Sequence, residues 1–310
     1  MSARPDYSEE LAPCPPWVSR DLFPFRGRFI DVGRHRLHYF DEGVGPTILL
    51  LHPAPAWSGY FRELILGLRN RFRCVAPDLP GFGLSPVRAG TACSLREHSD
   101  AVEAFAAKLG LREVALLVHD SGGPIGLGMA TRQPEWFRAF VLTSTFAWPL
   151  TDYPGMRRML RLVGSRPFGA LNAALNLVPR AMTRFGPRRR QLTSAECTAL
   201  TGAFPTWAHR QRMTGLMGEL ARDDAYLRGV EQGLRARLAD RPALIMYGEK
   251  DPARLVGFDR HFERLFPRHR SVVIAGEQHF PHLAAADEVA QHVRDFLDDL
   301  AQDEGEPVHP

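Results

Sequence analysis

The 310-residue sequence lacks the features that define several large classes of protein. No run approaches the roughly 20 consecutive apolar residues of a membrane span. The first ten residues contain no apolar signal-peptide core. The four cysteines have neither metal-ligand nor disulfide-framework spacing. We therefore expect a cytoplasmic protein with reduced thiols, no membrane partner and no metal.

Cofactor and nucleic-acid motifs are also missing. Residues Gly81 to Gly83 lack the third glycine and the following acidic residue of a dinucleotide fingerprint, and no phosphate-binding loop occurs. The formal net charge of +4 is too small and too scattered to indicate a nucleic acid. We expect no cofactor, a small-molecule substrate and water as partners, and leave the oligomeric state open.

Strand and helix patterns alternate along most of the chain. A hairpin is expected around Gly33, because alternating residues flank it. Further strands are expected near residues 47–52, 72–78, 114–118, 139–145, 243–248 and 271–275. With the helical patterns between them, they predict an α/β protein with a mostly parallel eight-stranded sheet and helices on both faces.

The alternation stops in one long internal segment. Residues 147–238 contain several helical patterns separated by proline and glycine, and so predict a helical cap inserted after strand 6. The core is then formed by residues 1–146 and 239–310. We expect the first 24 residues to lie over the surface, and the acidic tail from about residue 301 to be disordered.

The chain's most informative motif follows the apolar run 114–118. The next residues are His-Asp-Ser-Gly-Gly, and a helical pattern starts at once. This is the shape of a nucleophile elbow, a sharp turn from strand to helix. When its glycines are aligned with those of the usual Gly-x-Ser-x-Gly, Asp120 holds the nucleophile position. A carboxylate nucleophile attacks a saturated carbon that bears a leaving group and forms an ester.

Two further residues complete a candidate triad. Asp251 and His279 each follow a predicted strand, and carboxyl ends of parallel strands meet at one edge of a sheet. His282 is an alternative to His279. Asp251 could instead order an Asp-Pro turn, and Asp120 could simply cap the helix after it.

Backbone groups and aromatic side chains would build the rest of the site. The N–H groups of Ala54 and Ser121 form the natural oxyanion-hole pair. A buried, largely apolar pocket is expected between core and cap. Its candidate wall residues are His52, Trp57, Phe146, Trp148, Phe204, Trp207 and Phe280. Among these, His52 is better explained as a structural residue than as a catalytic one.

Five segments resemble a known family. Residues 52–62, 76–85, 119–127, 203–210 and 248–253 are similar to motifs of the haloalkane dehalogenases and of related Asp-nucleophile α/β-hydrolases, which include epoxide hydrolases. The resemblance spans roughly residues 25–298. It implies the α/β-hydrolase fold and a hydrolase of small or medium apolar electrophiles.

The resemblance also implies residue roles. Asp120 would be the nucleophile, His279 would activate water against the ester, and Asp251 would orient and charge-balance His279. The oxyanion hole would serve the second step, in which water attacks the ester carbonyl.

Two positions depart from the dehalogenase pattern. The Trp and Asn that usually hold the halide are replaced by Ser121 and Ala54. Loss of one such donor typically costs about 3 to 4 kcal/mol in the transition state. A hydroxyl at Ser121 could donate instead, and Trp57, Trp148 or Trp207 could reach the site.

Other leaving groups stay open for the same machinery. Epoxide hydrolases use two cap tyrosines, and this insertion has only Tyr153 and Tyr226. A β-lactone needs little help, because its opening releases a carboxylate. Two further alternatives are an esterase with Ser121 as nucleophile and a ligand-binding protein without catalysis.

The insertion is also strongly basic. From residue 147 to 240 it contains fifteen arginines, no lysine and seven acidic residues, for a net charge of +8, and Arg188 to Arg190 is the densest point. These arginines could attract anionic substrates, or they could solubilise exposed helix faces.

Overall fold

The computed structural model describes residues 10–88, 90 and 93–303. Its described strands form one sheet in the order β1-β2-β3-β5-β4-β6-β7-β8-β9. β1 to β3 and the β3–β5 pair are antiparallel, and all other neighbours are parallel. The strands are β1 (Glu10–Leu11), β2 (Arg28–Val32), β3 (His35–Glu42), β4 (Thr47–Leu51), β5 (Arg73–Pro77), β6 (Val114–Asp120), β7 (Phe137–Thr145), β8 (Ala243–Gly248) and β9 (His269–Ile274).

The mostly parallel sheet agrees with the sequence prediction, and it has one strand more than expected. β1 pairs with β2 at the sheet edge, with Glu10 opposite Phe29. The sequence predicts a surface position for this segment, and both residues of β1 are exposed; the strand itself was not predicted, because two residues are too short for a recognisable alternating pattern. Residues 1–9 of the same prediction lie outside the described part of the chain.

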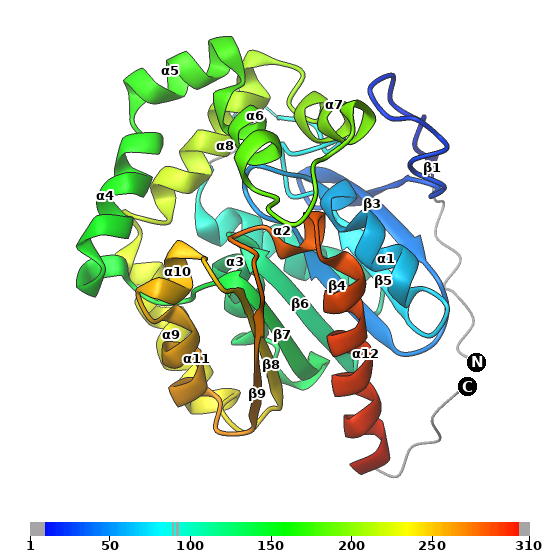
Figure 1. Ribbon diagram of the computed structural model, residues 1–310, viewed down its shortest axis with the longest axis vertical. Coiled ribbons are helices and arrows are strands. Elements are labelled where there is room, and N and C mark those ends of the chain that lie inside the picture. Colours follow the sequence, from blue (N-terminus) through cyan, green and yellow to red (C-terminus); the bar gives the residue numbers. More distant parts are fainter. Residues whose placement is uncertain (1–9, 89, 91–92, 304–310) are drawn as a thin grey trace.

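Helices cover both faces of the sheet, as predicted (Figure 1). Along β4, Ile48 and Leu50 join one core cluster, and Leu49 and Leu51 join the other, as expected for alternating side chains. The first face holds α1 (Arg62–Leu68), preceded by η1 (Ser58–Phe61), and α12 (Ala286–Asp303). The second face holds α2 (Leu95–Lys108), α3 (Gly122–Ala130), α9 (Asp224–Arg237) and α11 (Phe258–Leu265).

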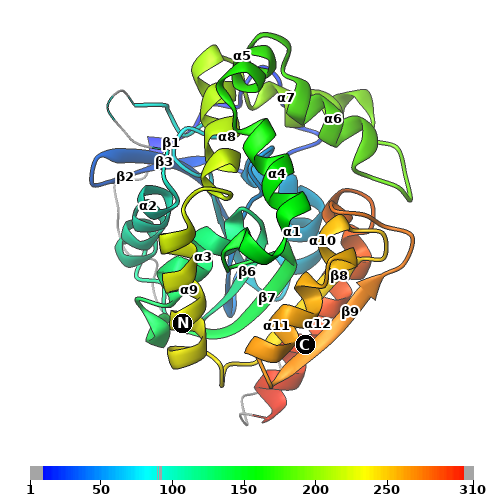
Figure 2. The ribbon, with the colours of Figure 1, turned by 90° about the vertical axis from the view of Figure 1, so that its left-hand side faces the viewer.

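The segment between β7 and β8 is helical. Its elements are η3 (Leu150–Asp152), α4 (Pro154–Val163), α5 (Arg166–Leu175), α6 (Leu177–Phe185), α7 (Ser194–Gly202), α8 (Trp207–Glu219) and α9. We call α4 to α8 the cap; these helices lie over the carboxyl ends of the parallel strands (Figure 2). α9 packs against α3 instead, and the Tyr226 hydroxyl donates to Pro124 O at 2.9 Å. Residues 224–237, which the sequence predicts to be part of the cap, therefore form a helix on the second face of the sheet.

The two helices predicted near the C-terminus are present. α11 lies within the helix that the sequence predicts near residues 256–266, and a separate short helix, α10 (Pro252–Leu255), precedes it; Gly257, with φ +88°, lies between the two. α12 continues to Asp303, past the predicted end at residue 300. The expected disordered tail therefore concerns residues 304–310, which lie outside the described chain.

Two further features of the described residues are the lengths of the apolar helices and the state of the cysteines. Within the described residues, no helix is long and apolar enough to cross a bilayer. Cys14, Cys74, Cys93 and Cys197 all belong to the described part, and each is a free thiol there.

Candidate active site

The turn after β6 has the backbone geometry of an elbow. Asp120, its central residue, adopts φ +48°, a left-handed conformation that residues other than glycine rarely adopt. The Thr145 hydroxyl of β7 donates to Asp120 O at 2.6 Å and so holds the turn from the neighbouring strand. Such strain persists only where surrounding structure enforces it, and it concentrates at functional sites.

The two glycines after the turn are explained by close packing. A Cβ at Gly122 would overlap the carbonyl oxygen of Leu51 in β4. A Cβ at Gly123 would overlap the hydroxyl of Thr145. The start of α3 can therefore approach β4 and β7 only when these positions carry no side chain.

The structure brings Asp120, His279 and Asp251 together at the carboxyl ends of the parallel strands, beneath the cap. His279 Nε2 lies 3.5 Å from Asp120 Oδ1, and His279 Nδ1 lies 3.1 Å from Asp251 Oδ1. The Asp251 side chain is fully buried and also accepts from Ala253 N at 2.9 Å, so it caps α10 as well. The two functions suggested for Asp251 are therefore compatible.

Electrostatics favour an ion pair between these residues. Burial alone would lower the pKa of His279, but Asp251 and Asp120 raise it to about 10. Burial alone would raise the pKa of the Asp120 carboxyl, but the hydrogen bond and charge of His279 lower it. The pKa of Asp251 is lowered by His279 in the same way, against the effect of burial.

Backbone donors face the second oxygen of Asp120. The Ala54 N–H donates to Asp120 Oδ2 at 3.4 Å. A hydrogen bond from the Ser121 backbone also lowers the pKa of Asp120. The Ser121 hydroxyl is buried, and within the described structure it has no hydrogen-bond partner. One carboxylate oxygen is thus held by N–H groups, and the other faces His279.

Two further histidines lie behind His279. His119 Nε2–H donates to the backbone carbonyl of His279 at 2.8 Å, and burial lowers the pKa of His119 to about 3. Neutral His119 therefore supports the loop that carries His279, a role that the sequence alone did not indicate. His282, the alternative to His279, is buried with Nε2 3.0 Å from Thr143 Oγ1.

A cavity of about 360 Å³ opens above the triad. Of the seven predicted wall residues, only Phe146 and Phe280 line it. The other lining residues, apart from the triad, are Pro55, Ser144, Met156, Met159, Leu160, Val178, Ala181, Met182, Phe185, Gly186, Met217, Pro252, Ala253, Phe258 and Gln278. The described lining is therefore apolar except for the triad, Ser144 and Gln278.

The five remaining predicted wall residues lie elsewhere: four are buried in the core, and Trp207 faces solvent. His52 donates from Nδ1 to Pro53 O and accepts from Leu79 N. Trp57 lines a separate cavity of about 490 Å³ beside residues 11–27. Trp148 stacks on His261, and Phe204 packs against Phe82. The Trp207 side chain is 51% exposed.

The tryptophans and tyrosines that were candidate donors do not line the cavity in the described structure. Trp57 Nε1 donates to Ala199 O at 3.1 Å. The Tyr153 hydroxyl lies 3.4 Å from His261 Nδ1, and the Tyr226 hydroxyl bonds to Pro124. The described lining of the cavity therefore contains no indole or phenol.

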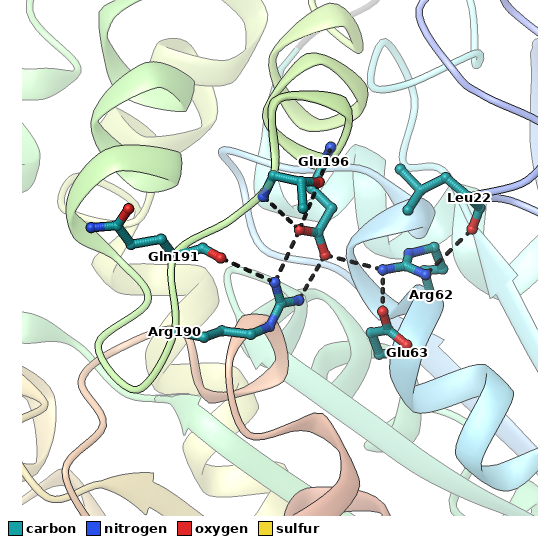
Figure 3. Close-up of polar contacts among 7 residues, drawn as sticks. Leu22, Arg62, Glu63, Arg190, Gln191 and Glu196 are labelled. Carbon is teal, nitrogen blue, oxygen red and sulfur yellow. Dashed lines mark hydrogen bonds and ion pairs between the residues drawn. The ribbon is translucent and has the colours of Figure 1, made fainter.

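The densest arginine cluster of the insertion connects the cap to the core. The backbone N–H groups of Arg188 and Arg189 donate to the Glu277 carboxylate at 3.3 and 2.9 Å. Figure 3 shows Arg190 and Arg62 on opposite sides of Glu196, at 2.7 and 3.1 Å. These arginines therefore serve cap–core contacts, and they do not support attraction of anionic substrates.

Metal ligands do not cluster in the part of the chain that the structure describes. Within those residues, no group of three or more His, Cys, Asp or Glu side chains is placed to hold a metal ion.

Comparisons with known proteins define the class. Residues 46–286 match the sequence profile of the alpha/beta hydrolase fold family, so the chain belongs to that family of enzymes. Within it the chain is haloalkane dehalogenase-like. Haloalkane dehalogenase 2 of Mycobacterium tuberculosis is 33% identical over 270 residues, which are 87% of this chain and 94% of the relative.

A second relative has a different printed activity. The cis-3-alkyl-4-alkyloxetan-2-one decarboxylase of Shewanella oneidensis is 28% identical over 299 residues, with 89% of each chain covered. Among solved structures, an ancestral haloalkane dehalogenase superposes with a TM-score of 0.76 at 22% identity, over 89% of this chain and 99% of that chain. The epoxide hydrolase CorEH gives 0.76 at 17% identity, over 88% and 99%. These two structures support the fold alone.

Proposed function

We propose that this protein is a hydrolase in which Asp120 attacks a saturated carbon of a small or medium apolar electrophile. The observation that carries the proposal is the strained elbow position of Asp120, with one oxygen toward Ala54 N and the other toward His279. Attack breaks the bond from carbon to the leaving group, and an alkyl ester of Asp120 forms.

Water then hydrolyses the ester. Once Asp120 is esterified, His279 is left without this carboxylate partner and releases its Nε2 proton to solvent. The neutral Nε2 then takes a proton from water as the water attacks the ester carbonyl. Asp251, bonded to Nδ1, fixes the ring and balances its charge. The Ala54 N–H stabilises the oxyanion that develops at Oδ2. Its collapse breaks the bond from the carbonyl carbon to the ester oxygen, which leaves as the product alcohol with the proton of the added hydroxyl, and the Asp120 carboxylate is restored.

The cavity lining supports an apolar substrate. Its described walls are methionine, leucine, valine, proline and phenylalanine side chains, which favour an apolar group next to the reacting carbon. Haloalkanes are the first class to test, because a haloalkane dehalogenase is 33% identical over most of the chain.

A second candidate substrate is a β-lactone. The positions that usually donate to a halide are Ser121, whose hydroxyl has no bond in the described structure, and Ala54. A β-lactone needs no such donor, because the broken carbon–oxygen bond leaves a carboxylate. The name of the Shewanella oneidensis relative, an alkyl-substituted oxetanone decarboxylase, supports this class. Epoxides are disfavoured, because no tyrosine lies in the described lining.

Paired variants test the proposal. Turnover is measured on a mixed panel of haloalkanes, β-lactones and epoxides. Asp120→Asn should lower turnover at least about ten-thousand-fold, since it removes the nucleophile. Ser121→Ala is the matched control at the neighbouring position. It should keep most activity, because the Ser121 hydroxyl makes no bond in the described structure.

Two results would contradict the proposal. Activity that survives Asp120→Asn and is lost in Ser121→Ala would identify an esterase with Ser121 as nucleophile. Tight binding of panel members by the wild type without any turnover would identify a ligand-binding protein.

A further inference from the structure

The helices beside the cavity opening expose arginines and large apolar side chains together. We propose that this surface binds an anionic lipid bilayer and places the cavity opening against the membrane, from which an apolar substrate can enter. We call it the mouth surface; it consists of Arg158, Met159, Arg161 and Leu162 of α4 and Arg180, Arg184 and Phe185 of α6. The proposal is independent of which residue attacks the substrate.

The mouth surface carries unneutralised positive charge. Residues 153–195 contain nine arginines and no aspartate, glutamate or lysine. Arg157 pairs with Asp224, and Arg188 to Arg190 belong to the cap–core contacts. The four arginines of the mouth surface are exposed, and the described structure gives them no acidic partner. Anionic headgroups attract arginines placed in this way.

Exposed apolar side chains lie at the same place. Leu162 is 64% exposed, Phe185 63% and Met159 44%. Met159 and Phe185 also line the cavity, so they mark where it meets solvent. Leu162 follows Met159 by three residues on α4, and the Arg184 guanidinium lies 5.6 Å from the centre of the Phe185 ring. Arginine combined with exposed leucine and phenylalanine is typical of helices that lie in a membrane interface.

Solubilisation of the cap and self-association both fit the mouth surface less well than a bilayer does. Arginines that only solubilise the cap would not require Leu162 and Phe185 to be exposed beside them. A symmetric contact with a second copy would place arginines opposite arginines, which is unfavourable. The expectation of no membrane partner rested on the absence of an apolar run, a criterion that addresses spanning segments and not surface contact.

Co-sedimentation with vesicles tests the proposal. The full-length wild type should sediment with phosphatidylcholine vesicles that contain phosphatidylglycerol, and much less with phosphatidylcholine alone. Arg161→Gln combined with Arg184→Gln should lower the partition coefficient about 25-fold, because each arginine near the surface contributes about five-fold. Leu162→Ser should lower it about ten-fold by removing apolar burial.

The matched controls are two exposed residues outside the cap, Arg34 and Val44, and Val44 is 72% exposed. Arg34→Gln and Val44→Ser should sediment like the wild type, and thermal unfolding should show that every variant is folded. The proposal is overturned if the wild type stays in the supernatant with anionic vesicles. It is also overturned if Arg34→Gln and Val44→Ser lose as much binding as the variants of the mouth surface. Self-association through this surface without lipid would also overturn it.

Discussion

Asp120 combines three properties that are individually uncommon for an aspartate. It has a positive φ, its pKa is lowered although desolvation acts to raise it, and its two oxygens face different partners. A helix-capping aspartate would need none of these, and α3 begins after Ser121 without any side-chain cap. The same carboxylate is therefore poised both to attack and, as an ester, to be attacked.

The charge balance around His279 predicts when a proton leaves. Burial lowers the pKa of His279, but Asp251 and Asp120 raise it to about 10, so the imidazole is protonated in the free enzyme at neutral pH. Esterification removes the charge of Asp120, and the pKa of His279 should fall. We predict release of up to about one proton per ester formed, before product appears.

Stopped-flow absorbance with a pH indicator measures this release on any substrate that the panel identifies. In Asp251→Asn the charge that raises the pKa of His279 most is gone, so less of the imidazole should be protonated beforehand and the early release should shrink. Protons that appear only in step with product in the wild type would contradict the assigned ion pair.

At the scale of elements, the connection between α6 and α7 ties the cap to the core. Glu277, two residues before His279, accepts from the backbone of this connection, and Arg189 pairs with Glu288 of α12. Glu196 of α7 accepts from Arg190 and from Arg62 of α1. The cap wall of the cavity and the loop carrying His279 are thereby held as one unit.

Glu196→Gln should weaken this connection. We expect the free energy of unfolding to fall by about 1 to 3 kcal/mol at neutral pH, as for buried hydrogen bonds to a charged group. Glu63→Gln is the matched control: Glu63 pairs with Arg62 but is 36% exposed, and its loss should cost at most about 1 kcal/mol. Denaturant titration of both variants measures the difference.

The pH dependence of the difference follows from Glu196. Burial raises the pKa of its carboxyl, but Arg190 and Thr193 outweigh this and lower it to about 2. The carboxylate therefore stabilises the fold above its ordinary pKa, and the contribution is lost as the pH falls from there toward 2. An equal loss of stability in both variants, or a difference that persists in acid, would contradict this account.

For the whole molecule, the parts that could be predicted from sequence are those fixed by the backbone. Asp120, Asp251 and His279 each end or follow a strand, so the parallel sheet itself brings them to one edge. The glycines after Asp120 are required because α3 approaches β4 and β7 closely. Each of these constraints acts on a residue and its close neighbours in the sequence, so it produces a recognisable sequence motif.

The cavity walls could not be predicted in the same way. Trp57, Trp148 and Phe204 were natural candidates, yet they pack in the interior away from the cavity. Methionines of α4, α6 and α8 line it instead, at positions that depend on how three cap helices pack over the sheet. Which side chains face the cavity depends on tertiary packing, and no local sequence pattern predicts it.

The most direct test of the account is intact-protein mass spectrometry of His279→Phe after incubation with the haloalkane, β-lactone and epoxide panel. Without the imidazole, water is not activated and the ester should accumulate. We predict a stable mass increase that maps to Asp120 and identifies the substrate class. An adduct on Ser121, or no adduct on folded protein with any member, would contradict the carboxylate nucleophile.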